Sequence, residues 1–114
     1  MHEASIALSV LNTVTEECCQ RGFSTIESIR LRIGKGSGIL PDALSFAFDI
    51  AKRDSIAKEA QLHIDLISLG GTCHECGETF EVEERFLLAC PQCQGTDFVI
   101  NQGYEMNIVD MEVN

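Results

Sequence analysis

The stretch CHECGETFEVEERFLLACPQC, residues 73–93, decides how this chain is organised. It holds two Cys-x-x-Cys pairs, Cys73 with Cys76 and Cys90 with Cys93, and 13 residues separate the pairs. Two residues between cysteines let both sulfurs of a tight turn face one ion, and two such turns complete a tetrahedron. Four thiolates in tetrahedral geometry suit Zn²⁺. The pattern therefore predicts a structural zinc site in a small ribbon-like lobe.

The lobe is too small to bury much apolar surface, so metal binding is expected to be part of its folding free energy. Phe80 and Val82 on one side, and residues 86–89 on the other, are predicted to form its two arms. Gly77 follows the first pair, where a positive φ is often needed. In the second pair Gly95 comes one position later, after Gln94, so a less regular turn is expected. Disulfides or a redox role for the cysteines remain alternatives.

The rest of the chain alternates helical and extended patterns. Residues 4–21 show an apolar period of 3.6 and predict a helix, and a second helix is expected to begin at Pro41. Alternating apolar residues predict strands at 29–33 and 62–66, and a last strand running from Tyr104 with a change of phase after Ile108. A flexible glycine loop is expected at 34–38. If the strands pair, the phase change predicts a bulge or burial on both faces.

This order predicts an α+β fold, a three-stranded sheet with two helices plus an inserted zinc-ribbon-like lobe. The expected domain boundaries are 1–69 and 103–114 for the α/β domain and 70–102 for the insert.

The composition argues against contacts with nucleic acids and membranes. The 114 residues carry a formal net charge of −10, and the lobe has six acidic residues against a single Arg85. Because nucleic-acid affinity comes largely from Lys and Arg neutralising phosphates, no nucleic-acid partner is expected. No stretch approaches the length of a membrane span and no signal peptide is visible, so a cytoplasmic protein without membrane contact is expected.

The amino terminus, Met1-His2-Glu3, carries a second possible metal site. The Met1 amine, the backbone nitrogen of His2 and its imidazole can close two adjacent chelate rings around one ion. Three nitrogens in one plane suit Cu(II) or Ni(II). Glu3 can supply a backbone nitrogen or a carboxylate as a fourth donor. The alternative is that His2 and Glu3 only begin the first helix.

Together these residues resemble the HypA/HybF family of hydrogenase maturation proteins. The matching features, in order, are Met1-His2-Glu3, Ile33-Gly34, the two cysteine pairs with Pro91, and Gly103-Tyr104-Glu105-Met106. The resemblance covers essentially the whole chain, with Gln94 standing where a glycine is frequent.

The resemblance implies a nickel metallochaperone rather than an enzyme. It implies reversible Ni(II) binding as cargo at His2, Met1 and Glu3, and structural Zn(II) at Cys73, Cys76, Cys90 and Cys93. The implied partners are a HypB-type GTPase and the [NiFe] hydrogenase large subunit, with urease as a further recipient in some members. A homodimer is left open.

Other residues carry weaker expectations. Cys18 lies on the apolar stripe of the first helix and is expected in the core, with Cys19 exposed and oxidisable. His74 is interpreted as an exposed turn residue, or alternatively as an additional or neighbouring metal ligand. The main rival function is a zinc-ribbon interaction module without a transferable metal.

Overall fold

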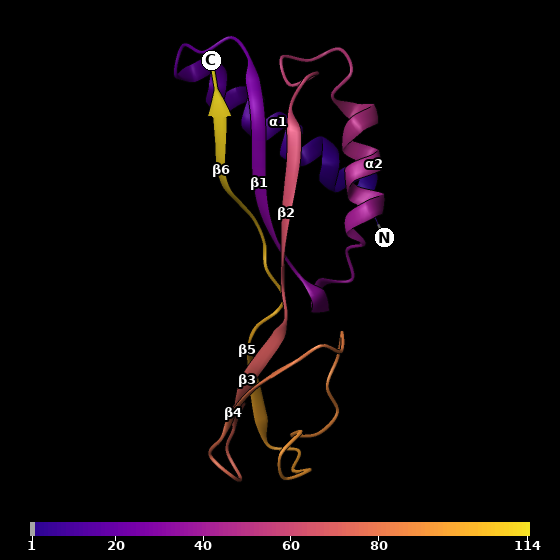
Figure 1. Cartoon of the computed structure of the whole chain (residues 1–114), viewed down its shortest axis with the longest axis vertical. Coiled ribbons are helices and arrows are strands. Elements are labelled where there is room, and N and C mark those ends of the chain that lie inside the picture. Colours follow the sequence, from indigo (N-terminus) through magenta and orange to yellow (C-terminus); the bar gives the residue numbers. More distant parts are fainter. Residues whose placement is uncertain (1) are drawn as a thin grey trace. The chain divides into compact units, whose positions relative to one another are not determined.

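The computed structural model describes residues 2–114, which form two compact units (Figure 1). The first comprises residues 2–32, Ile39–Asp65 and Asn107–Asn114, and the second comprises Ile33–Gly38 and Leu66–Met106. No helix in residues 2–114 is long and apolar enough to cross a membrane. The fold is α+β, as the sequence predicts.

Two helices belong to the first unit, and both are where the apolar periodicity predicts them. α1 spans Glu3–Gln20 and α2 spans Pro41–Ala51, with the proline in the first turn. The helices pack against each other through their apolar faces. The buried residues of α1 are Ile6, Ala7, Val10, Leu11, Val14 and Cys18, and those of α2 are Leu44 and Phe48. Cys18 is therefore in the core, and Cys19 is exposed.

A three-stranded sheet accompanies these helices, as predicted. Its strands are β1 (Ile26–Gly34), β2 (Gln61–Ile67) and β6 (Met106–Val113), in the order β2-β1-β6. β6 runs antiparallel to β1, because Thr25 and Asn114 exchange backbone hydrogen bonds at one end and Gly34 donates to Glu105 at the other.

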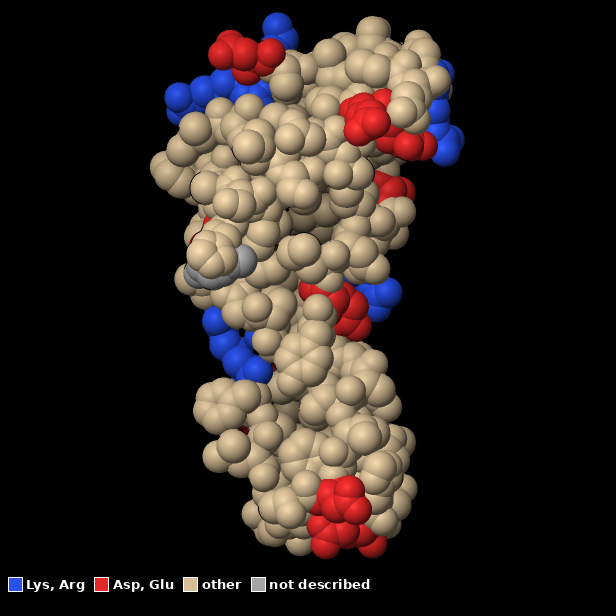
Figure 2. Space-filling view, turned by 180° about the vertical axis from the view of Figure 1, so that it is seen from behind, with Lys and Arg blue, Asp and Glu red and all other residues tan. Residues whose placement is uncertain are grey.

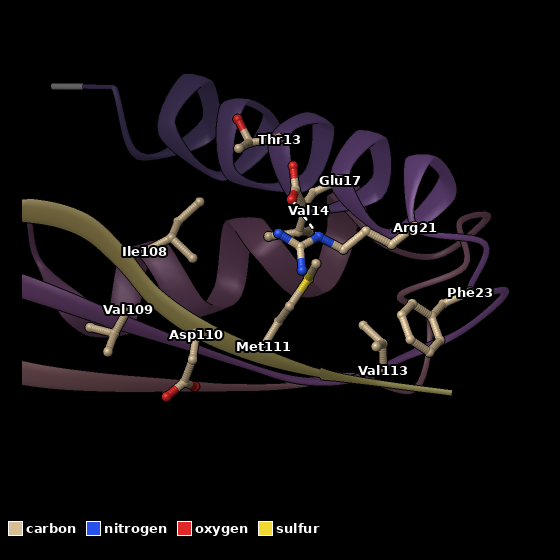
Figure 3. Close-up of a pocket in the computed structure, with 10 residues that line it drawn as sticks. All are labelled: Thr13, Val14, Glu17, Arg21, Phe23, Ile108, Val109, Asp110, Met111 and Val113. Carbon is tan, nitrogen blue, oxygen red and sulfur yellow. Dashed lines mark hydrogen bonds and ion pairs between the residues drawn. The ribbon is translucent and has the colours of Figure 1, made fainter.

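The change of phase in β6 is a real feature of the strand (Figure 3). Ile108, Met111 and Val113 point toward α1, whereas the consecutive residues Val109 and Asp110 both point away from it. Two neighbouring side chains on one face are typical of a β-bulge. The expected bulge is present, with the apolar face resuming at Met111 rather than at Val109.

The second unit contains a sheet that the sequence pattern only partly revealed. β3 (Leu69–Cys73) lies between β4 (Thr79–Val82) and β5 (Phe98–Gln102), with antiparallel pairing on both sides. Gly70 pairs with Gln102 across β3 and β5. A Cβ atom at Gly71 would collide with the carbonyl of Val99, which explains a glycine in the central strand.

Two local predictions were wrong, and a third was incomplete. Residues 86–89 form no strand; Phe86 and Leu88 are exposed, and β5 takes the position of the second arm. The last strand begins at Met106 and not at Tyr104, whose ring lies against Gly36. The glycine loop 34–38 contains a 3₁₀ helix, Lys35–Ser37, in which Lys35 forms an ion pair with Glu83 at 2.7 Å.

Acidic side chains are spread over the face seen in Figure 2. One acidic cluster lies at the lower end, in the cysteine-rich lobe, without Lys or Arg beside it in this view, whereas the other acidic side chains have Lys or Arg nearby. The expectation that this lobe does not bind nucleic acid rests on that charge, since phosphates are repelled by such a surface.

Candidate metal centre and amino terminus

The four cysteines come together at one end of the second unit. Their sulfur atoms all lie within 4.8 Å of one another, with Cys73 and Cys90 buried and Cys76 and Cys93 exposed. The Cys73 and Cys93 sulfurs are 3.7 Å apart, and the Cys76 and Cys90 sulfurs are 3.8 Å apart. Tetrahedral sulfurs at about 2.3 Å from a central ion are separated by about 3.8 Å. The cluster therefore has the size of a four-thiolate metal site and is too open for disulfides.

Each Cys-x-x-Cys pair is built into a tight turn of the same type. Gly77 donates its N–H to the carbonyl of Cys73 at 3.0 Å, and Gln94 donates to Cys90 at 2.9 Å. Both residues that close these turns have positive φ, 76° at Gly77 and 67° at Gln94. The turns are thus equivalent, and the left-handed position in the second is held by Gln94, not by Gly95. A side chain there costs about 1 kcal/mol.

Gln94→Gly is expected to stabilise the metal-loaded protein by about 0.5–1 kcal/mol, because glycine adopts the left-handed conformation without steric cost. Part of the gain is offset by the greater freedom of glycine in the unfolded chain. Guanidinium denaturation of the zinc-loaded protein measures the change. Gln94→Asn, which also tolerates positive φ, is expected to fall between the two proteins, and Gly77→Ala to destabilise. A Gln94→Gly protein less stable than its parent would contradict this account.

Backbone N–H groups point at the sulfurs. Glu75, Gln92 and Gly95 donate to Cys73, Cys90 and Cys93 respectively, at 3.3–3.4 Å. Hydrogen bonds that the backbone N–H groups of Cys93 and Gln92 donate to the Cys90 sulfur lower the pKa of Cys90 to about 7. The Gly95 N–H acts in the same direction on Cys93, but partial desolvation of its sulfur and hydrogen bonds with the other three thiols raise the pKa of Cys93 to about 12. A metal ion bound here must displace protons, so its affinity depends on pH.

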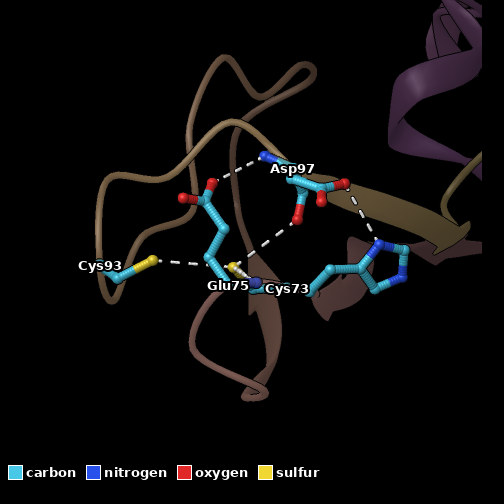
Figure 4. A network of polar contacts seen from close by, with 5 residues as sticks. Cys73, Glu75, Cys93 and Asp97 are labelled. Carbon is cyan, nitrogen blue, oxygen red and sulfur yellow. Dashed lines mark hydrogen bonds and ion pairs between the residues drawn. The ribbon is translucent and has the colours of Figure 1, made fainter.

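A polar network supports the first turn from outside (Figure 4). The His74 ring lies 3.2 Å from the Asp97 carboxylate, and the His74 N–H donates to the Asp97 carbonyl at 2.8 Å. The Asp97 N–H in turn donates to the Glu75 carboxylate at 3.0 Å. Among residues 2–114, the potential metal ligands that lie close enough together to share one ion are the four cysteines, and His74 is not among them. His74 is an exposed turn residue whose ring contacts Asp97.

At the amino terminus, Met1 lies outside the described residues, so the structure bears on His2 and Glu3 alone. His2 is exposed and precedes α1 with a left-handed backbone, φ 83° and ψ 34°. Its carbonyl accepts a hydrogen bond from Ile6 at 2.9 Å, while its side chain makes no capping bond to the helix. His2 therefore begins α1 through its backbone, and both the helix-start interpretation and a metal-binding imidazole are compatible with this position.

Glu3 has a role that the sequence did not reveal. It lies in the first turn of α1, but its carboxylate accepts the N–H of Leu40, the residue that precedes α2, at 3.2 Å. This hydrogen bond is the main cause that lowers the pKa of Glu3. The ionised carboxylate therefore contributes stability above a pH of about 4.5, and the contribution is lost as the pH falls through the lowered pKa. Glu3 connects the starts of both helices.

Comparison with known proteins agrees with this geometry. A family model described as hydrogenase/urease nickel incorporation, metallochaperone, HypA matches residues 1–113. Hydrogenase maturation factors HypA of Rhodobacter capsulatus and Rhizobium leguminosarum bv. viciae are 39% and 40% identical over 113 residues, 99% of both chains in each case. The solution structure of the Ni metallochaperone HypA from Helicobacter pylori is similar, with a TM-score of 0.69 and 25% identity over 99% of this chain and 97% of that one.

Proposed function

Because this chain belongs to the HypA family of nickel-incorporation metallochaperones, we propose that it binds Ni(II) reversibly at its amino terminus and passes the ion on for hydrogenase maturation. The ligands are the His2 imidazole and backbone nitrogen, the Met1 amine and Glu3. The four cysteines hold structural Zn(II). The nickel-binding domain comprises residues 1–69 and 103–114, and residues 70–102 form the zinc-binding domain.

The family match over residues 1–113 carries this proposal, and the chemistry of the two sites supports it. The cysteine cluster offers four sulfur ligands, two of them from buried residues, which is enough to fill a tetrahedral coordination sphere without a solvent ligand. Such a site retains its ion. An exposed chain end with three or four donors presents nickel to solvent and to a recipient, which suits cargo that has to be released. Zinc gains less from that planar nitrogen arrangement than nickel does.

The proposed partners follow from the hydrogenase maturation role of the family. A HypB-type GTPase works with the chain, and the large subunit of [NiFe] hydrogenase receives the nickel. We place the protein in the cytoplasm and assign it no catalytic activity, since a metal carrier needs ligands and a docking surface rather than groups that react with a substrate.

Equilibrium dialysis of the untagged, zinc-loaded protein against Ni²⁺ tests the proposal. One nickel per chain is expected in addition to one zinc, and apo large subunit added together with the GTPase and GTP is expected to remove the nickel. A protein that takes up zinc alone would be an interaction module without a transferable metal. Nickel that stays on the chain in the presence of the recipient would contradict a delivery role.

Glu3→Ala separates the two ways in which Glu3 can bind nickel. The variant keeps the backbone nitrogen but loses the carboxylate and its hydrogen bond to Leu40. Nickel affinity is expected to fall by about tenfold, since disturbed support of a ligand commonly costs 10–100-fold. Isothermal titration measures the change, with Asp42→Ala in the first turn of α2 as the matched control. Loss of all nickel binding would instead make the carboxylate indispensable.

A further inference from the structure

A groove of about 490 Å³ runs between α1 and β6 (Figure 3). Both walls belong to the first unit, so the groove is formed within one compact part of the chain. Residues that line it include Val14, Glu17, Arg21, Phe23, Met111 and Val113. Phe23 remains 42% exposed at one end.

The wall formed by β6 is also the edge of a sheet. In the order β2-β1-β6, β6 is bonded to β1 on one side only. Asn114 and Thr25 exchange both of their backbone hydrogen bonds, at 2.9 and 3.1 Å. Because the direction of the backbone groups alternates along an antiparallel strand, the N–H and C=O groups of Val113 and Met111 face away from β1. The edge therefore offers donors and acceptors to a further strand.

The same two residues face the groove with their side chains. Met111 and Val113 are half-buried and point toward α1. An extended segment bonded to this edge would place every second side chain on the α1 side of the sheet, beside Met111. Methionine adapts its shape to different apolar partners. The bulge at Val109 and Asp110 limits this pairing to the end of the strand, because a bulge interrupts the regular ladder.

The charges of the edge determine which segment fits. The charged residues of β6 are Asp110 and Glu112, both exposed, and the opposite wall carries Glu17 in a 2.7 Å ion pair with Arg21. A second copy of β6 would bring acidic residues against acidic residues, which is unfavourable in paired strands. A strand with Lys or Arg on its outer face complements this edge.

From the edge geometry, the groove and the charge, we propose that β6 is a docking site for an extended segment of a partner protein. The segment alternates aliphatic residues with Lys or Arg and adds to the sheet beside β6. Binding does not require nickel, since the groove contains neither His2 nor Glu3.

Titration of the ¹⁵N-labelled, zinc-loaded full chain with the acetylated and amidated peptide Lys-Val-Lys-Val-Lys-Val-Lys tests the proposal. Amide shifts are expected in β6 and in the facing turns of α1, and hydrogen exchange of the Met111 and Val113 amides is expected to slow by about tenfold or more. Two control peptides, one with Glu in place of Lys and one with N-methylated valines, are expected to bind more weakly, by about tenfold.

Two variants test the contributions of the strand edge and of its charge separately. Val113→Pro removes one N–H that faces the edge and leaves the bonds to β1, so it is expected to weaken peptide binding while the spectrum of the folded protein persists. Asp110→Lys is expected to raise the Kd about threefold, whereas Asp54→Lys, with the same change of net charge outside the groove, leaves it unchanged. Shifts outside β6 and α1, equal binding of the Glu peptide, or self-association through β6 would overturn the proposal.

Discussion

Addition of Gly-Ser before Met1 is expected to abolish nickel binding while zinc content and fold are retained. The extension moves the free amine away from His2, so the two adjacent chelate rings can no longer close around one ion. Because this removes a ligand rather than its support, the affinity is expected to fall more than the roughly 10–100-fold typical of outer-shell changes. Equilibrium dialysis against Ni²⁺ measures the loss, and circular dichroism checks the fold.

His2→Ala is expected to give the same result, since the imidazole is the first of the proposed ligands. His63→Ala in β2 is the matched control, because it removes a histidine from the same unit but outside the amino terminus. Nickel bound with unchanged affinity by both the extended protein and His2→Ala would show that the ion sits elsewhere on the chain. The control variant should retain nickel fully.

Cys76→Ala is expected to remove zinc and unfold the second unit. The four sulfurs occupy the corners of one site, and the lobe around them has a small apolar centre in which Phe80 meets Phe98 at 6.0 Å between ring centroids. Binding of structural zinc contributes about 10–16 kcal/mol in small zinc-dependent folds, far more than this aromatic pair. Zinc content is expected to fall from one per chain to nearly none, with loss of protected amides in β3, β4 and β5.

Cys19→Ala is the matched control, since Cys19 is an exposed thiol on α1, outside the metal-sized group. It should retain zinc and melt like its parent. The amides of α1 and α2 are expected to stay protected in Cys76→Ala, because the core of these helices lies in the first unit. An unchanged melt of Cys76→Ala would mean that the lobe folds without its metal.

The elements that the sequence predicts well are those whose signal is local. The apolar periodicity of α1 and the Pro41 start of α2 need no distant partner to be recognised, and the Cys-x-x-Cys spacing defines its turns by itself. Residues 86–89 misled the prediction, because an apolar run gives no information about whether it is buried. Phe86 and Leu88 are exposed in a loop, whereas β5 is defined by its pairing with β3.

The contacts that escaped prediction connect residues far apart in the chain. Glu3 carries an acidic side chain at the start of α1, a position typical of a helix N-terminus. Its carboxylate instead accepts a hydrogen bond from the N–H of Leu40, just before α2. This contact depends on how the two helices pack, so it could not be predicted from the local sequence. The second turn was predicted to be less regular because Gly95 comes one position later than Gly77 does in the first. That prediction was wrong, because Gln94 adopts the left-handed conformation itself and closes an equivalent turn.

The pairing of Gly70 with Gln102 has an evolutionary consequence. The chain departs from and returns to the same point, so everything between these residues is a cassette with adjoining ends. If the segment were deleted, a short turn could join Gly70 to Gln102 without moving the rest of the chain, because the entropic cost of closing a short loop between adjacent ends is small. A lineage can therefore lengthen, replace or lose this cassette through one deletion or insertion, without a change to the path of the remaining chain.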